Sequence, residues 1–264
     1  MPLLDVAHLR KTYGGRRVVD DVSFSVDRGE IVGLLGRNGA GKTTSFRMVM
    51  GMIEPDAKHG AVQFNGRDVS RLAMYQRARL GIGYLSQEPS IFQRLSVEKN
   101  LTAILQTRRG NRSWRQEKLE ELLTQFDLGK TRKQAARTLS GGERRKLELA
   151  RALVTDPKLI LLDEPFSGVD PRTVENLQEE IRALRDMHGI AILITDHNVH
   201  QTLRVCDRAY IIDQGRIFAD GAPRELINDA NVKRVYLGSL FRGDEFDDRD
   251  GAPTVTVPGP KARI

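Results

Sequence analysis

The hydrophobic pattern of the chain is dominated by short apolar runs that alternate with longer amphipathic segments. Residues 31–35, 159–162 and 190–195 are the clearest apolar runs, and each has the composition of a strand buried on both faces. Residues 143–153 and 172–187 carry apolar positions on one face, at the spacing of a helix. Buried strands that alternate with helices predict an α/β fold with a mostly parallel sheet.

Two regions depart from this alternation. Residues 3–9 are apolar, residues 22–26 alternate strictly between apolar and polar positions, and residues 61–64 precede an Asn-Gly turn. These three segments predict a lobe of antiparallel strands. Residues 97–155 contain leucines at helical spacing, and they predict a helical lobe inserted into the α/β chain.

The C-terminal end of the chain differs in composition from the rest. Residues 243–264 contain several acidic residues and then several prolines, with few apolar positions to bury. Such a segment cannot offset the entropy lost on ordering. We therefore predict one folded domain over residues 1–242 and a disordered tail over residues 243–264.

The amino-acid composition of the chain excludes several classes of protein. Apolar residues make up 39% of the 264 residues, enough for a sizeable core, and the formal net charge is +7. The basic residues are spread along the chain, so we interpret them as a solvated surface and expect no direct nucleic-acid partner. Cys206 is the single cysteine, which excludes an intrachain disulfide. No apolar run approaches the roughly 20 residues of a membrane-spanning helix, and the N-terminus does not resemble a signal peptide.

A glycine-rich segment after the apolar run at residues 31–35 carries the strongest chemical signal. It fits the pattern G-x-x-x-x-G-K-[ST] and opens a predicted helix, which is the context that a phosphate-binding loop needs. Lys42 supplies a positive charge to the outer phosphates of a nucleotide, and the Thr43 hydroxyl is suited to bind Mg²⁺. Backbone N–H groups at the helix N-terminus favour the remaining phosphate oxygens. The nucleotide contacts predicted here are Gly36, Arg37, Asn38, Gly39, Ala40, Gly41, Lys42, Thr43 and Thr44.

Two adjacent carboxylates end the apolar run at residues 159–162. We predict that Asp163 holds Mg²⁺ and that Glu164 is the general base for the attacking water. Neighbouring side chains of a strand point to opposite faces, so the two carboxylates need different roles. An apolar strand that ends in Asp-Glu is common, and the phosphate loop elsewhere in the chain favours the catalytic interpretation.

A second pair of glycines stands at the start of another predicted helix. Ser140 and Glu143 fit a capping box around this N-terminus. The intervening Gly141 and Gly142 also make it a second anion site. One chain with two phosphate-binding helix N-termini suggests that each serves a different nucleotide.

Together, residues 36–43, 139–143 and 159–164 resemble the ATP-binding cassette family, and the resemblance extends over about residues 3–241. This resemblance also implies roles for individual residues outside the three motifs. Tyr13 matches the aromatic residue that stacks on adenine.

Three more positions match this family. Gln87 matches the glutamine that contacts Mg²⁺ and faces the membrane subunit. Asp170 belongs to the loop after the catalytic glutamate, and His197 matches the histidine that senses the γ-phosphate. The resemblance therefore implies a catalytic set of Lys42, Gln87, Glu164 and His197.

The resemblance also implies a fold, an assembly and a location. The fold is a phosphate-loop NTPase with a mixed RecA-like sheet, an antiparallel β lobe and a helical subdomain. ATP and Mg²⁺ are the cofactors, and two copies pair head to tail. The homodimer drives a pair of transmembrane permease subunits, which provide the membrane contact. We accordingly expect a cytoplasmic protein, peripheral on the cytoplasmic face of the inner membrane.

We refer to residues 36–43, 139–143 and 159–164 as the motor motifs. Several stretches outside them resemble the ATPases of lipopolysaccharide exporters, above all residues 232–238. The chain departs from that subfamily at Arg37 and Ser86, where prolines are usual, and at Gln93, where an arginine is expected. A branched-chain amino acid importer ATPase is the nearest alternative. A soluble cassette ATPase acting on ribosomes or nucleic acid is an alternative of another class, but such proteins usually carry two cassettes or a coiled-coil insertion.

Overall fold

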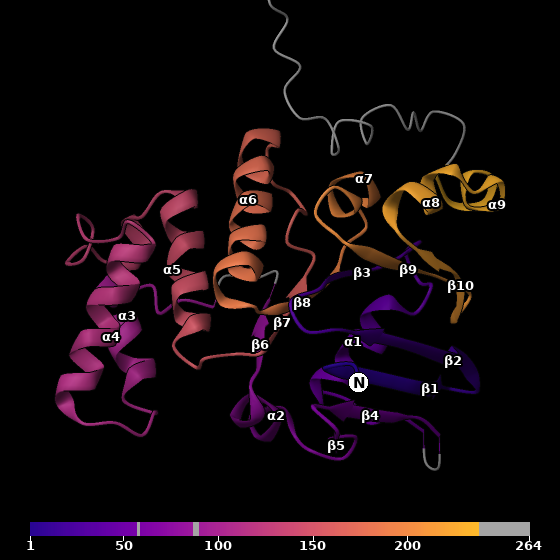
Figure 1. Cartoon of the computed structure of the whole chain (residues 1–264), viewed down its shortest axis with the longest axis horizontal. Helices are drawn as coiled ribbons and strands as arrows, with labels where there is room; N and C mark the ends of the chain where they lie inside the picture. The colour runs from indigo at the N-terminus through magenta and orange to yellow at the C-terminus, as the bar shows by residue number, and fades with distance from the viewer. Residues whose placement is uncertain (57–58, 87–89, 238–264) are drawn as a thin grey trace, which may run out of the picture.

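The chain was analysed as a computed structural model, which describes residues 1–56, 59–86 and 90–237. The predicted tail at residues 243–264 and the predicted site residue Gln87 lie outside the described residues. The described part contains two β-sheets, a group of helices beside them and a layer of helices above them (Figure 1).

A six-stranded sheet forms the centre of the molecule. Its order is β10-β9-β3-β8-β7-β6, and all neighbours are parallel except the antiparallel pair β9 and β10. The apolar runs form its middle strands because both faces of those strands are covered. The predicted mixed sheet is therefore confirmed. The strands are β3 (Ile31–Gly36), β6 (Ile82–Leu85), β7 (Leu159–Asp163), β8 (Ala191–Thr195), β9 (Arg208–Asp213) and β10 (Arg216–Gly221).

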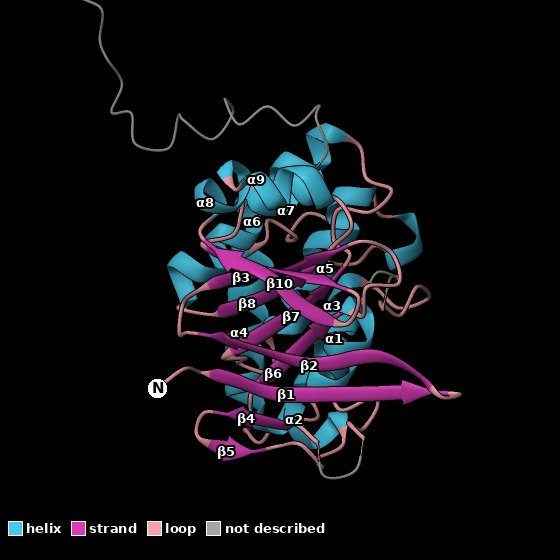
Figure 2. Ribbon diagram, turned by 90° about the vertical axis from the view of Figure 1, so that its right-hand side faces the viewer, coloured by secondary structure: helices cyan, strands magenta, loops and turns pink. Residues whose placement is uncertain are grey.

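A second sheet confirms the predicted antiparallel lobe. It has four strands in the order β2-β1-β4-β5, all antiparallel. Figure 2 shows it below the six-stranded sheet, with α1 beside both. Its strands are β1 (Leu4–Tyr13), β2 (Arg16–Val26), β4 (Ala61–Phe64) and β5 (Arg67–Asp68).

The helices form two groups around the sheets. Helices α3, α4 and α5 form the group at the left of Figure 1, in which α5 lies next to β6, whereas α6 to α9 lie along the upper side. Residues 233–237 continue the chain after α9 as a short π-helix. The helices are α1 (Lys42–Met50), α2 (Met74–Leu80), α3 (Val97–Leu105), α4 (Arg112–Gln125), α5 (Gly141–Leu153), α6 (Pro171–His188), α7 (Val199–Leu203), α8 (Pro223–Asn228) and α9 (Ala230–Val232).

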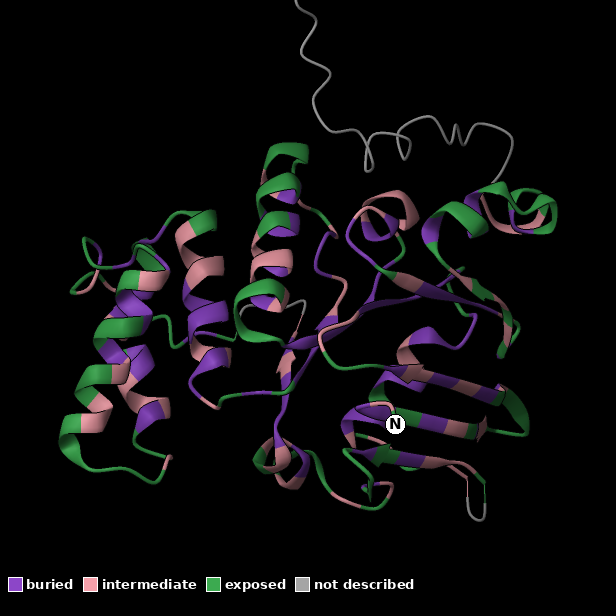
Figure 3. Cartoon of the chain, viewed as in Figure 1, coloured by how far each residue is buried: buried purple, intermediate pink, exposed green. Residues whose placement is uncertain are grey.

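Each face of the six-stranded sheet is covered by a different layer. Successive residues of a strand point to opposite faces. Leu159 and Leu161 of β7 accordingly pack in one cluster with α1 and the four-stranded sheet, whereas Ile160 and Leu162 pack in another with α5 and α6. Figure 3 shows the buried positions concentrated in the sheets and on the helix faces turned toward them. Among the described residues, no helix has the length and apolar content that crossing a membrane requires.

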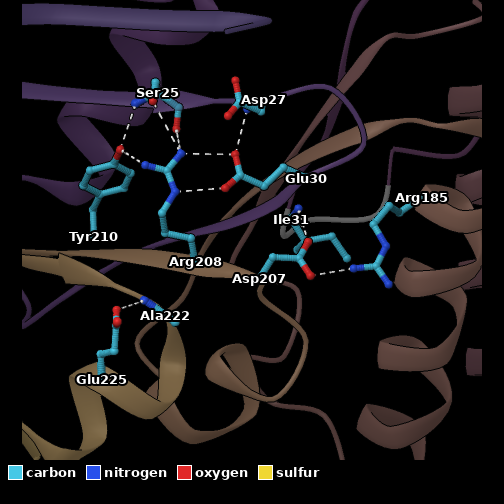
Figure 4. A network of polar contacts seen from close by, with 10 residues as sticks. All are labelled: Ser25, Asp27, Glu30, Ile31, Arg185, Asp207, Arg208, Tyr210, Ala222 and Glu225. Carbon is cyan, nitrogen blue, oxygen red and sulfur yellow. Dashed lines mark hydrogen bonds and ion pairs between the residues drawn. The ribbon is translucent and has the colours of Figure 1, made fainter. Parts of the chain in front are cut away.

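A polar network ties the lower sheet to the end of the central one (Figure 4). Arg208 of β9 donates from Nε to Glu30 Oε1 at 2.9 Å and from Nη2 to Glu30 Oε2 at 3.2 Å. Its Nη1 donates to the Tyr210 hydroxyl, and its Nη2 also donates to the Ser25 carbonyl at 3.2 Å. One guanidinium thus holds β2, β3 and β9 together, because Ser25 and Glu30 flank the connection between the first two.

We expect replacement of Arg208 by methionine to lower the free energy of unfolding by about 2 kcal/mol, since bonds to a charged group are lost while the partly buried Glu30 carboxylate stays. Denaturant unfolding followed by circular dichroism measures the change. The matched control is the exposed Arg67, whose replacement by methionine should leave the unfolding midpoint close to that of the parent. Equal midpoints for both variants would show that the network adds nothing to stability.

Candidate nucleotide-binding site

The predicted phosphate loop connects the end of β3 to the start of α1, as the sequence indicated. Its glycines are required by close approaches. A Cβ atom on Gly36 would lie 2.3 Å from the Ile212 carbonyl oxygen, and one on Gly41 would lie 2.7 Å from the Val18 carbonyl oxygen. Gly41 is also the N-cap of α1 with φ of 108°, and no described side chain accepts a hydrogen bond there. The first N–H groups of α1 therefore remain available to an anion.

Lys42 lies inside this loop. Its side chain is buried, and Nζ donates to the Gly36 carbonyl at 2.6 Å and to the Arg37 carbonyl at 3.1 Å. Burial lowers the pKa of the ammonium, while the charges of Glu164 and Asp196 act in the opposite direction. The loop thus keeps a positive charge on its inner side, where phosphate oxygens can replace the two carbonyls as acceptors.

The back of the loop is fixed by an acidic residue of β2. Asp20 lies 2.5 Å from Arg216 Nη2, 2.9 Å from Arg17 Nη1 and 3.4 Å from Arg10 Nε. The hydrogen bond from Arg216 is the main reason that the pKa of Asp20 is lowered. These contacts join β1, β2 and β10. The Asp20 N–H also donates to the Gly215 carbonyl at 2.7 Å, and the Gly215 N–H donates to the Ala40 carbonyl of the loop at 2.9 Å, which links the three strands to the loop.

The two predicted carboxylates lie next to each other at the carboxyl end of β7. Asp163 ends β7, and burial together with the charge of Glu164 raises its pKa. Glu164 follows with φ of 46°, a left-handed conformation that is strained for a residue with a side chain. Its N–H donates to the Thr195 carbonyl at 2.7 Å, at the end of β8. This bond fixes the strained turn and aims the Glu164 side chain away from the strand.

His197 lies beside Glu164. Its Nδ1 atom is 3.4 Å from Glu164 Oε2 and 3.5 Å from Asp196 Oδ1, and about half of its side chain is exposed. The structure therefore brings Lys42 and His197, which are distant in sequence, together with the adjacent pair Asp163 and Glu164. All four lie where the carboxyl ends of parallel strands meet, the usual ligand edge of such sheets.

Sequence reasoning missed one residue of this group, Asp196. Its side chain is completely buried, and burial is the main cause of its raised pKa. Its Oδ2 accepts from the Phe166 N–H at 2.9 Å, and its Oδ1 accepts from the Asn198 N–H at 2.8 Å. It therefore holds both the loop after Glu164 and the turn that carries His197. The available signal was an acidic residue directly after the apolar run 190–195.

We expect Asp196→Asn to lower kcat up to about 100-fold with little change in ATP affinity, since an amide has one acceptor oxygen and one N–H loses its partner. Steady-state ATPase assays and nucleotide titrations separate the two quantities. Asp220→Asn, at an exposed position of β10, is the matched control. A parent-like kcat for Asp196→Asn would contradict this positioning role.

The second glycine pair lies at the start of α5, and its capping box is present. Ser140 Oγ accepts from the Glu143 N–H at 3.3 Å, and Glu143 Oε2 accepts from the Ser140 N–H at 2.9 Å. Gly141 and Gly142 line a cleft of about 970 Å³ between α5 and α6, together with Glu164 and other residues. The described phosphate-loop residues do not line that cleft. Within one chain, therefore, the two glycine motifs do not meet.

The remaining predicted residues lie around this centre. Tyr13 ends β1 with an exposed ring, and Lys11 Nζ lies 5.7 Å above it. Asp170 is the N-cap of α6 and accepts from the Thr173 N–H at 3.1 Å. Arg37, one of the departures noted above, donates to the Val235 carbonyl of the C-terminal segment.

The residues present suit Mg²⁺ that binds together with a nucleotide. No three His, Cys, Asp or Glu side chains are grouped as a metal cage in the described part of the chain. Magnesium is usually held by one or two carboxylates plus substrate phosphates. Asp163 is suited to provide the carboxylate, and the positive charge of Mg²⁺ would offset the burial and the repulsion from Glu164 that raise the pKa of Asp163.

Comparisons with known proteins agree with this geometry. A family model described as "ABC transporter" matches residues 19–167. The chain therefore belongs to the ABC transporter family, as an ATPase whose hydrolysis of ATP is coupled to transport. The solved ATP-binding cassette MJ1267, in its ADP conformation, superposes with a TM-score of 0.79 at 27% identity and covers 90% of this chain and 99% of its own.

Two similar relatives carry a more particular name. "Lipopolysaccharide export system ATP-binding protein LptB" of Escherichia coli (strain K12) is 53% identical over 243 residues, covering 92% of this chain and 100% of the relative. The protein of the same name from Haemophilus influenzae is 51% identical, with the same coverage. The similarity thus spans almost the whole chain and includes residues outside the motor motifs.

Proposed function

We propose that this chain is the ATP-hydrolysing subunit of a transporter that extracts and exports lipopolysaccharide from the inner membrane. The observation that carries the proposal is the 53% identity with LptB of Escherichia coli across the full length of that relative. Motor motifs alone say little about cargo. An identity of this size over 92% of the chain extends well beyond the nucleotide-binding motifs.

In the proposed mechanism, Lys42 and the N-terminal N–H groups of α1 hold the β- and γ-phosphates. Thr43, Asp163 and Gln87 would hold Mg²⁺, which would neutralise phosphate charge when bound. Glu164 accepts the proton of the attacking water, and His197, 3.4 Å from it, contacts the γ-phosphate. The short distance between the two side chains supports this division of roles.

The proposed assembly is a homodimer that holds ATP between two chains. Its support is the separation of the two glycine motifs within one chain, since the cleft lined by Gly141 and Gly142 lacks the phosphate loop. Ser140 and Gly142 of a second copy would complete the site around the γ-phosphate. Asp170 and Tyr13 complete the list of proposed nucleotide contacts.

A groove between the α/β part and the helical lobe is the proposed docking site for the membrane subunits. This docking groove has a volume of about 210 Å³ and is mainly apolar, and its walls include Met50, Met74, Arg77, Tyr84, Ile104 and Arg151. At its edge Arg151 lies 4.7 Å above the exposed ring of Phe92, next to Gln93. Docking there would place the chain on the cytoplasmic face of the inner membrane.

Co-purification combined with ATPase assays tests this function. The chain, expressed with the permease genes of its own genome, should be recovered with a pair of membrane subunits. Its ATPase activity should rise in vesicles or nanodiscs that contain lipopolysaccharide and not in those that contain phospholipid alone. Recovery with amino acid permease subunits would overturn the proposed cargo. Salt-sensitive binding to RNA or DNA, without membrane partners, would instead support a soluble cassette ATPase.

A further inference from the structure

Helix α2 contains an arginine that is almost completely buried. Arg77 is 1% exposed. Its guanidinium donates to backbone carbonyls of two separate segments, the end of α1 and the loop before α2. The acceptors are the carbonyls of Met48 at 2.8 Å, Val49 at 2.5 Å, Ser70 at 2.9 Å and Leu72 at 2.8 Å.

Carbonyl dipoles, rather than a carboxylate, are the immediate partners of this charge. No ion pair with Arg77 is formed among the described residues, and burial lowers its pKa to about 10 while the charge of Asp68 opposes the shift. The guanidinium therefore stays charged at neutral pH. Two of its acceptors belong to the last turn of α1, where the negative end of the helix dipole lies.

The packing around the Arg77 guanidinium leaves no space for a larger residue at Gly51. Gly51 is the C-cap of α1 with φ of 76°. A Cβ atom on Gly51 would lie 2.7 Å from Arg77 Nε and 2.6 Å from the Leu72 carbonyl oxygen. The end of α1, the loop before α2 and Arg77 are thus packed as one unit. A lysine in place of Arg77 has a single side-chain nitrogen. It cannot donate to all four carbonyls, which the three nitrogens of the planar guanidinium reach from different sides.

Arg77 also forms part of the wall of the docking groove, together with Met50 and Met74. Met50 is the last residue of α1, and Lys42 is its first. Since a helix rises about 1.5 Å per residue, these ends lie on the order of 12 Å apart. A short rigid helix therefore joins the groove wall directly to the phosphate loop.

We propose that Arg77 is a positioning residue that transmits occupancy of the docking groove to the phosphate loop through α1. This inference rests on the proposed docking of membrane subunits in that groove. A side chain that enters the groove contacts Met50 and Met74 and displaces the wall that Arg77 belongs to. Because Arg77 is bonded to the carbonyls of Met48 and Val49, the displacement moves α1 and with it the loop that holds phosphate.

The measured quantity is a ratio, the ATPase rate of the chain with its membrane subunits divided by the rate of the isolated chain. We expect Arg77→Lys to lower this ratio about five-fold or more, the lower end of common coupling between sites. Arg79→Lys, on the exposed side of the same helix, should keep the parent ratio. A purely structural arginine would change the melting temperature but leave the ratio unchanged, so a parent-like ratio in Arg77→Lys overturns the inference.

Hydrogen exchange on the parent protein gives a second test that needs no variant. Peptides covering residues 44–52 should exchange more slowly in the complex than in the isolated chain, and no difference would also overturn the inference. If the parent rate is not raised by the membrane subunits at all, the proposed function fails instead. If Arg77→Lys folds but no longer assembles, Arg77 is a docking residue and its role in transmission is disproved.

Discussion

Replacing Glu164 with glutamine is expected to lower the rate of ATP hydrolysis by about 10²- to 10⁴-fold, the usual contribution of a general base. Glutamine has nearly the same shape and keeps the backbone bond to the Thr195 carbonyl, but it cannot accept the proton of water. ATP affinity should stay near that of the parent. Because bound ATP then persists, the variant should accumulate as a dimer.

Single-turnover assays, nucleotide titration and size-exclusion chromatography with ATP measure these effects. Glu117→Gln, an exposed position of α4, is the matched control and should behave like the parent in all three. Hydrolysis by Glu164→Gln at the parent rate would show that another group activates the water. Absence of an ATP-dependent dimer in an inactive variant would argue against the shared site.

Replacing Lys42 with alanine should weaken ATP binding about 10- to 100-fold. The ammonium is buried inside the loop, and its bonds to phosphate oxygens are charge-assisted, each with a net value of about 1.5–3 kcal/mol. The two carbonyls that Lys42 occupies would also lose their donor. Titration with a fluorescent ATP analogue measures the change in affinity.

Lys158→Ala provides the control for this variant. Lys158 is exposed and precedes β7, at the opposite end of the strand from Asp163. Its removal changes the net charge by the same amount without touching the loop. Unchanged affinity in Lys42→Ala, or equal losses in both variants, would refute a direct phosphate contact.

The phosphate loop was predictable because its determinants are local. A buried strand, three glycines and a Lys-Thr pair follow one another in sequence. A Cβ atom on Gly36 or Gly41 would clash with nearby backbone, and Gly39 has a φ of 80° that favours glycine. The strand ends that carry Asp163 and His197 were predictable for a similar reason. Apolar runs identified their strands, and parallel packing brings the carboxyl ends of such strands to one edge.

Arg77 and Asp196 show what the sequence could not provide. Arginine and aspartate are almost never fully buried, so their positions suggest solvent-facing side chains. Their partners explain the burial, and each side chain has at least one partner far away in sequence: Met48 for Arg77 and Phe166 for Asp196. Helix α2 was not predicted either, because its residues offer too few apolar positions to define a helical face.

Helix α7 is shorter than its sequence pattern. The amphipathic pattern that begins in α7 continues to Cys206, but α7 ends at Leu203. The Asp207 N–H donates to the Ile31 carbonyl at 2.8 Å, and this bond directs the chain into β9. Cys206 instead packs against β3 on the sheet face that α5 and α6 cover, where a Cβ atom on Gly33 would lie 3.0 Å from its sulfur. Pairing with a distant strand therefore outweighed the local helical preference.

The left-handed backbone at Glu164 has a consequence for how the sequence is maintained. Asparagine and glycine adopt this conformation more easily than glutamate does, so at φ of 46° either would relieve strain of about 1 kcal/mol or more. A lineage that no longer needed turnover would thus be expected to drift toward these residues and gain thermal resistance. The glutamate present at this strained position is therefore consistent with the proposed role of Glu164 as the general base.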